Sequence, residues 1–198
     1  MTDPFFSAYA NRLQALLSVA DWSGVEQLAG DMLTAWRSQR RIFFCGNGGS
    51  AGNAVHLAND FLYGIAKSHG KGLNAVALPA NTAVITCLAN DLGYEHIYSE
   101  QLAVQAQPGD VLIAFSGSGN SPNIVAAIEC AQRMGVKTYA IVGYSGGRCK
   151  ALADVALHFP IDDMQISEDM QLIVGHMLMQ WLYDKRNLRD SPAASTDL

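Results

Sequence analysis

Five short apolar runs, each bounded by turn-forming residues, divide the chain. Apolar runs of this length are typical of strands that are buried on both faces of a parallel sheet. The five runs are RIFFC (41–45), LNAVALP (73–79), DVLIAF (110–115), VKTYAIV (136–142) and DVALHF (154–159). The sequence therefore predicts a sheet of five parallel strands.

Helical periodicity occupies the intervals between these runs. The predicted helices cover about 50–66, 81–90, 94–106, 121–134 and 148–153. Strands that alternate with helices build a parallel sheet with helices on both faces, so we predict a doubly wound α/β fold. In such a sheet of strand order 2-1-3-4-5, the first and third strands are neighbours whose helices leave on opposite faces.

Two further helical segments flank this alternating region. Residues 5–38 are typical of two amphipathic helices, and Ser23 is placed to cap the second. A long helix is predicted at about 166–187. We expect a single domain over 1–188 and a small, polar, disordered tail over 189–198. The apolar stripe of the first helix comprises Phe5, Phe6, Tyr9, Leu13, Leu16 and Leu17.

Composition and charge exclude several classes of partner. Hydrophobic residues make up 49% of the 198 residues and charged residues 16%, as in a well-packed globular protein. The net charge of −5 without a basic cluster argues against direct binding to nucleic acid or an anionic membrane. No apolar stretch approaches the ~20 residues of a membrane span. Four scattered cysteines and no secretion signal favour a cytoplasmic protein with reduced thiols.

Two glycine- and serine-rich loops carry the candidate chemistry. CGNGGSAGNAVH (45–56) follows the first strand and opens a helix, and SGSGNSPN (116–123) follows the third strand in the same way. Ser121 is a natural N-cap with Pro122 at the first helical position. Backbone N–H groups, serine hydroxyls and a helix N-terminus together bind anions without a lysine. In the predicted sheet both loops border one crevice, where doubly wound folds bind ligands.

Other ligands fit the first loop less well. Gly46, Gly48 and Ala51 formally match a dinucleotide-binding fingerprint, but the acidic residue expected after the second strand is absent. A nucleoside triphosphate loop would require a Gly-Lys-Ser or Gly-Lys-Thr ending, which the chain lacks. Two glycine-rich turns without a ligand remain the structural alternative.

At family level the combined motifs are specific. Four motifs resemble the sugar-isomerase (SIS) domain family. They are CGNGGSA with a later His, ANDLGYEHIYSEQL, GDVLIAFSGSGNSPNIVAAI and GYSGG. Within it, the chain is most similar to the phosphoheptose isomerases, which act on sedoheptulose 7-phosphate, and the resemblance spans residues 5–187. It implies a five-stranded flavodoxin-like sheet and a homotetramer with a helical core and active sites between subunits.

The resemblance assigns substrate contacts to both loops. It implies that the phosphate lies against serine hydroxyls and the N–H groups of 117–121, and that the sugar lies against the first loop. Gly117 stands where the isomerases often carry a threonine, so one hydroxyl is lost. Asn90 and Asp91 match a polar pair for sugar hydroxyls, although Asn-Asp before Leu-Gly also suits a helix end. The implied substrate-binding residues are Asn47, Gly48, Gly49, Ser50, Asn90, Asp91, Ser116, Gly117, Ser118, Ser121 and Glu168.

Two histidine–carboxylate pairs are candidates for proton transfer. His56 and Asp60 are four residues apart and share a helix face, while Glu168 and His176 lie on the last helix. The resemblance implies a catalytic role for Asp60, Glu168 and His176. Asp60 stands where the family has glutamate, and Glu168 where it has glutamine. The shorter side chain loses ~1.5 Å of reach, a misplacement that can cost ~100-fold in rate, and the carboxylate at position 168 could compensate.

The same four residues form a possible zinc site. His56, Asp60, Glu168 and His176 are a two-histidine, two-carboxylate donor set, and the resemblance implies that His56 is a ligand. Eight helical residues rise ~12 Å, too far for Glu168 and His176 to touch one ion. Either Glu168 precedes the regular helix, or the two come from different subunits, or one is not a ligand. A metal-free acid–base pair is the alternative to bound zinc.

These observations favour an enzyme that interconverts a ketose phosphate and an aldose phosphate through an enediol. Sedoheptulose 7-phosphate is the expected substrate. One rival is a non-catalytic phosphosugar-binding protein, similar to the replication-initiator-associated branch of the family. Another is an isomerase for a different phosphosugar, which Asp60, Gly117 and Glu168 suggest. The presence of His56, His176 and a carboxylate at position 60 favours the enzyme.

Overall fold

A five-stranded parallel sheet organises the molecule. The computed structural model describes residues 3–67 and 70–188, and its strand order is β2-β1-β3-β4-β5, which confirms the doubly wound, flavodoxin-like prediction. Every neighbouring pair is parallel. The strands are β1 (Arg41–Cys45), β2 (Asn74–Ala77), β3 (Val111–Ser116), β4 (Lys137–Val142) and β5 (Val155–His158).

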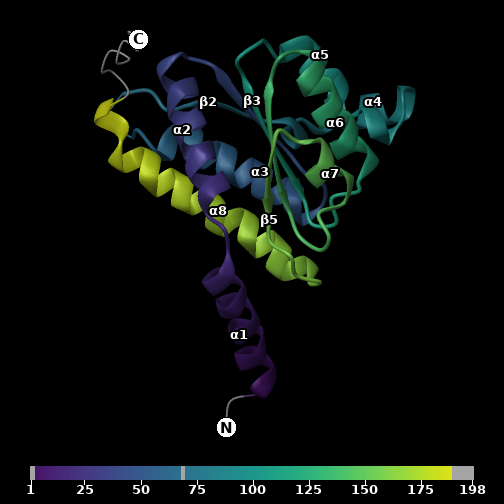
Figure 1. Ribbon diagram of the computed structural model, residues 1–198. Coiled ribbons are helices and arrows are strands. Elements are labelled where there is room, and N and C mark those ends of the chain that lie inside the picture. The colour runs from purple at the N-terminus through teal and green to yellow at the C-terminus, as the bar shows by residue number, and fades with distance from the viewer. Residues whose placement is uncertain (1–2, 68–69, 189–198) are drawn as a thin grey trace.

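Helices cover both faces of this sheet. In Figure 1, α2, α3 and α8 lie on one side of it and α5, α6 and α7 on the other, and each layer has its own hydrophobic core. The helices are α1 (Pro4–Val19), α2 (Ser23–Arg37), α3 (Gly49–Asn59), α4 (Thr82–Asp91), α5 (Ser99–Gln105), α6 (Pro122–Arg133), α7 (Gly147–Leu152) and α8 (Met164–Asp184), with 3₁₀ turns at Leu78–Ala80, Tyr94–His96 and Arg186–Leu188.

The helix that leaves the first loop is shorter than predicted. It ends as an α-helix at Asn59, and Asp60–Gly64 form a π-helical turn in which the Ile65 N–H donates to the Asp60 carbonyl at 3.1 Å. Leu57, Phe61 and Ile65 recur every four residues and are all buried. A wider turn keeps that spacing on one face better than the 3.6 residues of an α-helix do. Asp60 therefore lies at the junction between two helix types.

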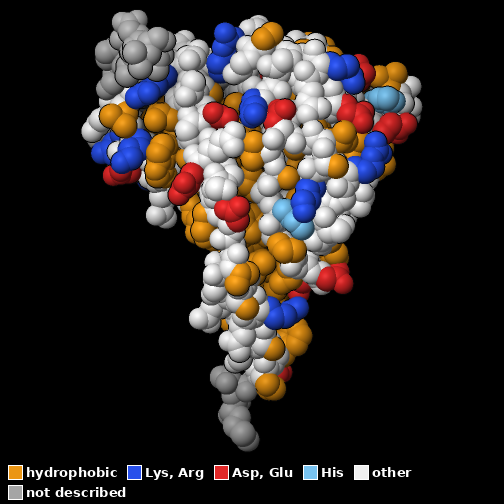
Figure 2. All heavy atoms as spheres, in the orientation of Figure 1, with side chains coloured by type: hydrophobic (Ala, Val, Ile, Leu, Met, Phe, Trp, Pro, Cys, Tyr) orange, Lys and Arg blue, Asp and Glu red, His pale blue; other side chains and the backbone are white. Residues whose placement is uncertain are grey.

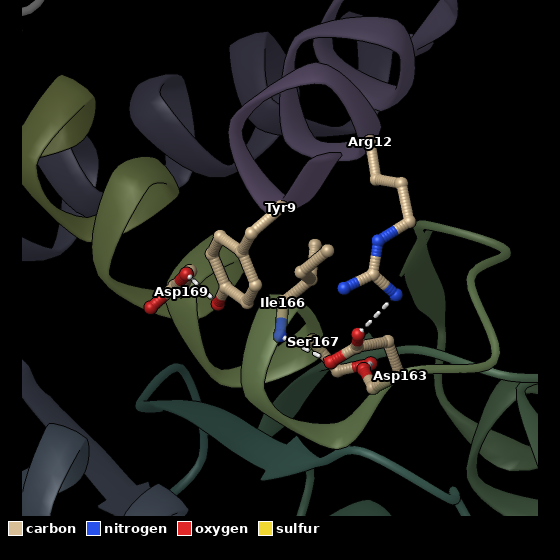
Figure 3. Close-up of polar contacts among 6 residues, drawn as sticks. All are labelled: Tyr9, Arg12, Asp163, Ile166, Ser167 and Asp169. Atoms are coloured by element: carbon tan, nitrogen blue, oxygen red, sulfur yellow. Dashed lines mark hydrogen bonds and ion pairs between the residues drawn. The ribbon is translucent and has the colours of Figure 1, made fainter. Parts of the chain in front are cut away.

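Helix α1 projects away from the sheet (Figure 1). It is tied to α8 by polar contacts that Figure 3 shows: the Tyr9 hydroxyl donates to Asp169 at 2.5 Å, and Arg12 pairs with Asp163 at 2.6 Å. Burial and the Asp169 carboxylate raise the pKa of Tyr9 to about 12, so the phenol remains a donor. The Ile166 N–H and Arg12 hold the pKa of Asp163, the N-cap of α8, below its usual value.

The apolar stripe of α1 is only partly covered by its own chain. Leu16 is buried, whereas Phe5 is 67% exposed and Phe6 71%. Hydrophobic side chains accordingly run along the projecting helix in Figure 2. The amphipathic pattern thus predicts the helix correctly, yet much of its apolar face is available to another surface.

The start of α2 differs from the prediction. Ser23 does not cap this helix, because the N-cap is Trp22; the Asp21 carboxylate instead accepts from the Ser23 N–H at 2.9 Å. At the other end of the chain, the predicted disordered tail at 189–198 lies outside the described residues. Among the residues that are described, no helix is both long enough and apolar enough to cross a membrane.

Close packing of α3 against α8 depends on Gly175. A Cβ atom added there would overlap the Cδ atoms of Leu57, which is 1% exposed. Glycine at this position lets the two helices approach closely, although glycine within a helix costs backbone entropy.

We expect Gly175→Ala to lower the free energy of unfolding by about 1–3 kcal/mol, because the added methyl overpacks the α3–α8 contact. Gly30→Ala is the matched control: Gly30 is exposed within α2, and an added Cβ there would meet nothing within 4 Å. It should raise stability by about 0.5–1 kcal/mol. Urea unfolding that shows the same change for both variants would contradict this account of the packing.

Candidate active site

The two glycine- and serine-rich loops lie side by side at the carboxyl ends of β1 and β3. These strands are paired, with Cys45 opposite Ala114, so the loops that follow them border one crevice. Tyr98 anchors the first loop by donating its hydroxyl to the Gly46 carbonyl at 2.5 Å. Burial raises the pKa of Tyr98, which keeps the phenol protonated. This is the switch point at which doubly wound sheets bind ligands.

The second loop is braced internally. The Ser116 hydroxyl accepts from the Gly119 N–H at 3.1 Å, and the Ser118 hydroxyl accepts from the Asn120 N–H at 3.3 Å. Two of the N–H groups expected to face a phosphate are therefore engaged within the loop. Ser121 is the N-cap of α6, as predicted, and its side chain makes no capping hydrogen bond. The N-terminus of α6 and this hydroxyl remain suited to an anion.

Neighbouring segments close around the same loop. A Cβ at Gly119 would overlap the Gly146 carbonyl, so the loop after β4 packs directly against it. A Cβ at Gly117 would overlap the Met164 sulfur at the start of α8. The space that a threonine side chain would need at position 117 is thus occupied by Met164 in this chain.

His56, Asp60 and His176 converge at the other end of α3. The two Nε2 atoms are 3.0 Å apart, and the nearer Asp60 oxygen lies 3.4 Å from His56 Nε2 and 3.7 Å from His176 Nε2. Both histidine side chains are about half exposed, at 50% and 47%, and that of Asp60 is 22% exposed. Residues from α3, the π turn and α8 therefore meet in one accessible group.

This group has the geometry and the donors for a metal ion. Its three ligand atoms lie within 4.8 Å of one another. Ligands held 2.0–2.2 Å from a tetrahedral zinc ion lie roughly 3.3–3.6 Å apart, which the observed separations of 3.0, 3.4 and 3.7 Å bracket. Two imidazoles and one carboxylate also match catalytic zinc sites, in which a fourth position is left for water or substrate.

Glu168 is not part of this metal-binding group. It lies within the regular part of α8, so the alternative in which it precedes the helix is wrong. A Cβ at Gly49 would overlap the Glu168 carboxylate, which therefore lies against the first residue of α3. The N-terminus of a helix favours a negative charge. Glu168 thus borders the first loop, two turns of α8 before His176.

A buried amide that the sequence analysis missed joins the two helices. Gln171, 1% exposed, donates to the Ser50 hydroxyl at 3.0 Å and accepts from the Asn53 amide at 2.9 Å. The same amide of Asn53 donates to the Glu168 carbonyl at 3.0 Å. The Ser50 hydroxyl, expected to face the substrate, is therefore engaged in the packing of α3 against α8. A glutamine at position 171, within the apolar stretch of 170–179, was the available signal.

Asn90 and Asp91 lie at the exposed end of α4. The Asn90 amide donates to Asp91 at 2.7 Å, and the Cys87 thiol lies 3.5 Å from the same carboxylate. The hydrogen bond to Asp91 raises the pKa of the Cys87 thiol. None of the residues of α4 is buried. The pair thus ends a helix, as the alternative interpretation holds, and it is also open to a ligand.

Comparisons with known proteins identify the class of protein that carries this fold and this crevice. Residues 5–143 match the SIS domain family, and the chain belongs to that family. Its relatives narrow the class to the phosphoheptose isomerases. The chain is 40% identical over 171 residues to the phosphoheptose isomerase of Akkermansia muciniphila, covering 86% of this chain and 89% of the relative. It is 38% identical over 154 residues to that of Rhodospirillum rubrum, covering 78% and 81%.

Solved structures agree with this placement. The phosphoheptose isomerase of Neisseria gonorrhoeae superposes with a TM-score of 0.83 at 29% identity, over 91% of this chain and 96% of that chain. That of Francisella tularensis superposes with a TM-score of 0.85 at 27% identity, over 93% and 100%. The resemblance inferred from the motifs is confirmed.

We expect Gln171→Leu to lower the free energy of unfolding by about 1–3 kcal/mol, because it removes the hydrogen-bond partner of the buried Ser50 hydroxyl and one of the two acceptors of the Asn53 amide. Gln132→Leu is the control, since Gln132 is exposed and its side-chain amide donates to the Leu152 carbonyl across the surface; it should change stability by less than about 1 kcal/mol. If denaturant unfolding ranked the two variants in the opposite order, Gln171 would not be the buried link between the helices.

Proposed function

We propose that this protein is a cytoplasmic aldose–ketose isomerase that converts sedoheptulose 7-phosphate into D-glycero-D-manno-heptose 7-phosphate. The observation that carries the proposal is the convergence of Asp60, His56 and His176 beside a crevice made of two loops. The likeness to phosphoheptose isomerases over most of the chain supports the choice of substrate.

Helix α8 connects the parts of the proposed site. Met164 at its start contacts Gly117 of the second loop, and Glu168 contacts Gly49 of the first. Farther along, His176 meets His56. In the proposed complex the phosphate binds at Ser116, Ser118 and Ser121, and the sugar chain lies along the first loop towards the two histidines. The Asn90–Asp91 pair binds hydroxyls of the sugar.

The reaction moves one proton between neighbouring carbons. A base removes a proton from C1 of the ketose while an acid protonates the C2 carbonyl oxygen, which gives the enediol. A base then takes the O1 proton as an acid delivers a proton to C2, so that the C1 aldehyde forms and O2 remains a hydroxyl. We assign these transfers to Glu168 and His176, which belong to one helix and lie on the side of the crevice that holds the sugar. Asp60 lies 3.7 Å from His176 Nε2, close enough to interact with the imidazole electrostatically.

We further propose that His56, Asp60 and His176 hold a zinc ion. Bound there, the ion would act as a Lewis acid that polarises the carbonyl and hydroxyl oxygens of the substrate. With zinc bound, His176 Nε2 is a ligand and transfers no proton, so Glu168 carries the proton transfers; the proton-transfer role of His176 given above belongs to the metal-free site. At position 60 this chain has aspartate, which is shorter than the glutamate that the resemblance implies. Its carboxylate nevertheless lies 3.4 and 3.7 Å from the two histidine nitrogens, which supports aspartate as a ligand.

A homotetramer with active sites between subunits completes the proposal. Exposed apolar side chains of α1, namely Phe5, Phe6 and Val19 at 67%, 71% and 80% exposure, offer a surface for a second subunit. An apolar groove of about 550 Å³ between α2 and α8 offers another. It is lined by Trp22, Val25, Glu26, Ala29, Met177, Leu178 and Trp181. The half-exposed His176 lies on the same helix as this groove.

We expect the wild-type protein to turn over sedoheptulose 7-phosphate, and His176→Ala to lower kcat/KM by about 100-fold or more, because general acid–base groups contribute 10²–10⁴-fold. The melting temperature should hardly change, since the His176 side chain is 47% exposed. His96→Ala, which removes an exposed histidine that pairs with Glu95, is the control and should retain activity. Full activity of His176→Ala would refute its catalytic role.

We expect calorimetric titration with Zn²⁺ to show one site per chain in chelator-treated protein. Asp60→Asn and His56→Ala should each weaken binding by more than about 100-fold, since even outer-shell changes cost 10–100-fold. Glu168→Gln is the discriminating control: it should bind zinc as the wild type does while losing turnover. Absence of zinc binding to the wild type, or its loss in Glu168→Gln, would contradict the assigned ligand set.

A further inference from the structure

Two asparagine side chains, Asn47 and Asn123, form a reciprocal pair of hydrogen bonds across the crevice, here called the clasp. The Asn47 amide nitrogen donates to the Asn123 carbonyl oxygen at 2.8 Å, and the Asn123 amide nitrogen donates back to the Asn47 oxygen at 2.7 Å. Asn47 belongs to the first loop, and Asn123 follows Pro122 at the start of α6. The pair therefore links, by side chains alone, the first loop, which is proposed to bind the sugar, to α6, whose N-terminus is proposed to bind the phosphate.

Additional partners fix the orientation of both amides. The Asn47 oxygen also accepts from the Tyr94 hydroxyl at 3.2 Å, and the Asn123 oxygen also accepts from the Ile124 N–H at 3.0 Å. An amide oxygen has two lone pairs, so both oxygens are saturated. Rotating either amide by 180° would place its NH₂ group against a donor and break these bonds.

Because its carbonyl oxygen is saturated, Asn47 can offer a ligand only a hydrogen-bond donor. Asn123 is 1% exposed, whereas Asn47 is half-buried at the crevice. Each amide has two N–H donors, of which the clasp uses one. The remaining N–H of Asn47 can therefore bind an oxygen that accepts, such as a sugar hydroxyl or carbonyl oxygen, while its own carbonyl is unavailable to a ligand.

We propose that Asn123 is a positioning residue that acts through Asn47 and holds its free N–H towards a substrate oxygen. This inference rests on the proposed isomerase function. It makes Asn47 a hydrogen-bond donor to the sugar, and it couples the placement of the sugar loop to that of α6. Asn123 touches no substrate itself.

A double-mutant cycle separates this role from a merely structural one. We expect Asn47→Ala and Asn123→Ala each to lower kcat/KM for sedoheptulose 7-phosphate by between about 3-fold and 100-fold, the range of coupling between contacting residues. Because Asn123 acts through Asn47, adding Asn123→Ala to Asn47→Ala should produce less than about a 2-fold further loss. Inhibition by inorganic phosphate should change by less than about 2-fold in Asn123→Ala, because the serine hydroxyls are untouched.

Two controls keep the outcome interpretable. Asn123→Asp retains the acceptor for the Ile124 N–H and adds a charge that a helix N-terminus favours, but it sets an oxygen against the Asn47 oxygen. Its melting temperature is measured alongside its activity, so that loss of folding is distinguished from loss of positioning. It should lose kcat/KM as Asn123→Ala does. Gln132→Ala, on the exposed face of α6, should leave kcat/KM unchanged.

The outcomes distinguish the two proposals. Independent, multiplicative losses in the double variant, with an active wild type, would overturn the positioning role of Asn123 and leave the isomerase proposal intact. Full activity of Asn123→Asp would overturn the positioning role in the same way. A wild-type protein that does not turn over sedoheptulose 7-phosphate would overturn both.

Discussion

The close approach of α3 and α8 is the constraint on which the rest of the site depends. Gly175 lets Leu57 pack against the backbone of α8, and Gly49 makes room for the Glu168 carboxylate. Gln171 pins the same two helices with buried hydrogen bonds. Only with this spacing do the Nε2 atoms of His56 and His176 come within 3.0 Å of each other. If larger side chains replaced these glycines, the two helices would lie farther apart and the two histidines would not be in contact.

The π turn adds to this constraint. Because α3 ends at Asn59, Asp60 is the first residue of the wider π turn. From there its side chain lies within 3.7 Å of both imidazoles. An aspartate can thus meet the histidines from a position at which the family resemblance implies a longer glutamate. The second departure, Glu168, lies apart from this group and borders the first loop. The two substitutions therefore serve different tasks in the proposed site rather than sharing one.

Hydrophobic periodicity and turn residues predicted most elements of the fold. All five strands and most helices follow from the apolar runs and the helical periodicity between them, because strands buried on both faces leave a plain signal. The strand order came from the doubly wound, flavodoxin-like fold that the family resemblance implies. The pairing of His56 with Asp60 also followed from helical spacing. Contacts between distant segments did not: the 3.0 Å histidine contact, the Gln171 link and the Asn47–Asn123 clasp depend on tertiary packing that no local pattern encodes. The Ser23 cap failed because Asp21, two residues earlier, binds its N–H.

Isotope incorporation from solvent tests the central claim most directly. Sedoheptulose 7-phosphate would be incubated with the protein in D₂O and the product followed by NMR. An enediol route through Glu168 and His176 predicts a heptose 7-phosphate that carries deuterium at C2, because the protonated groups exchange with solvent between the two transfers. A product formed without solvent deuterium at C2, or no heptose 7-phosphate at all, would contradict the account.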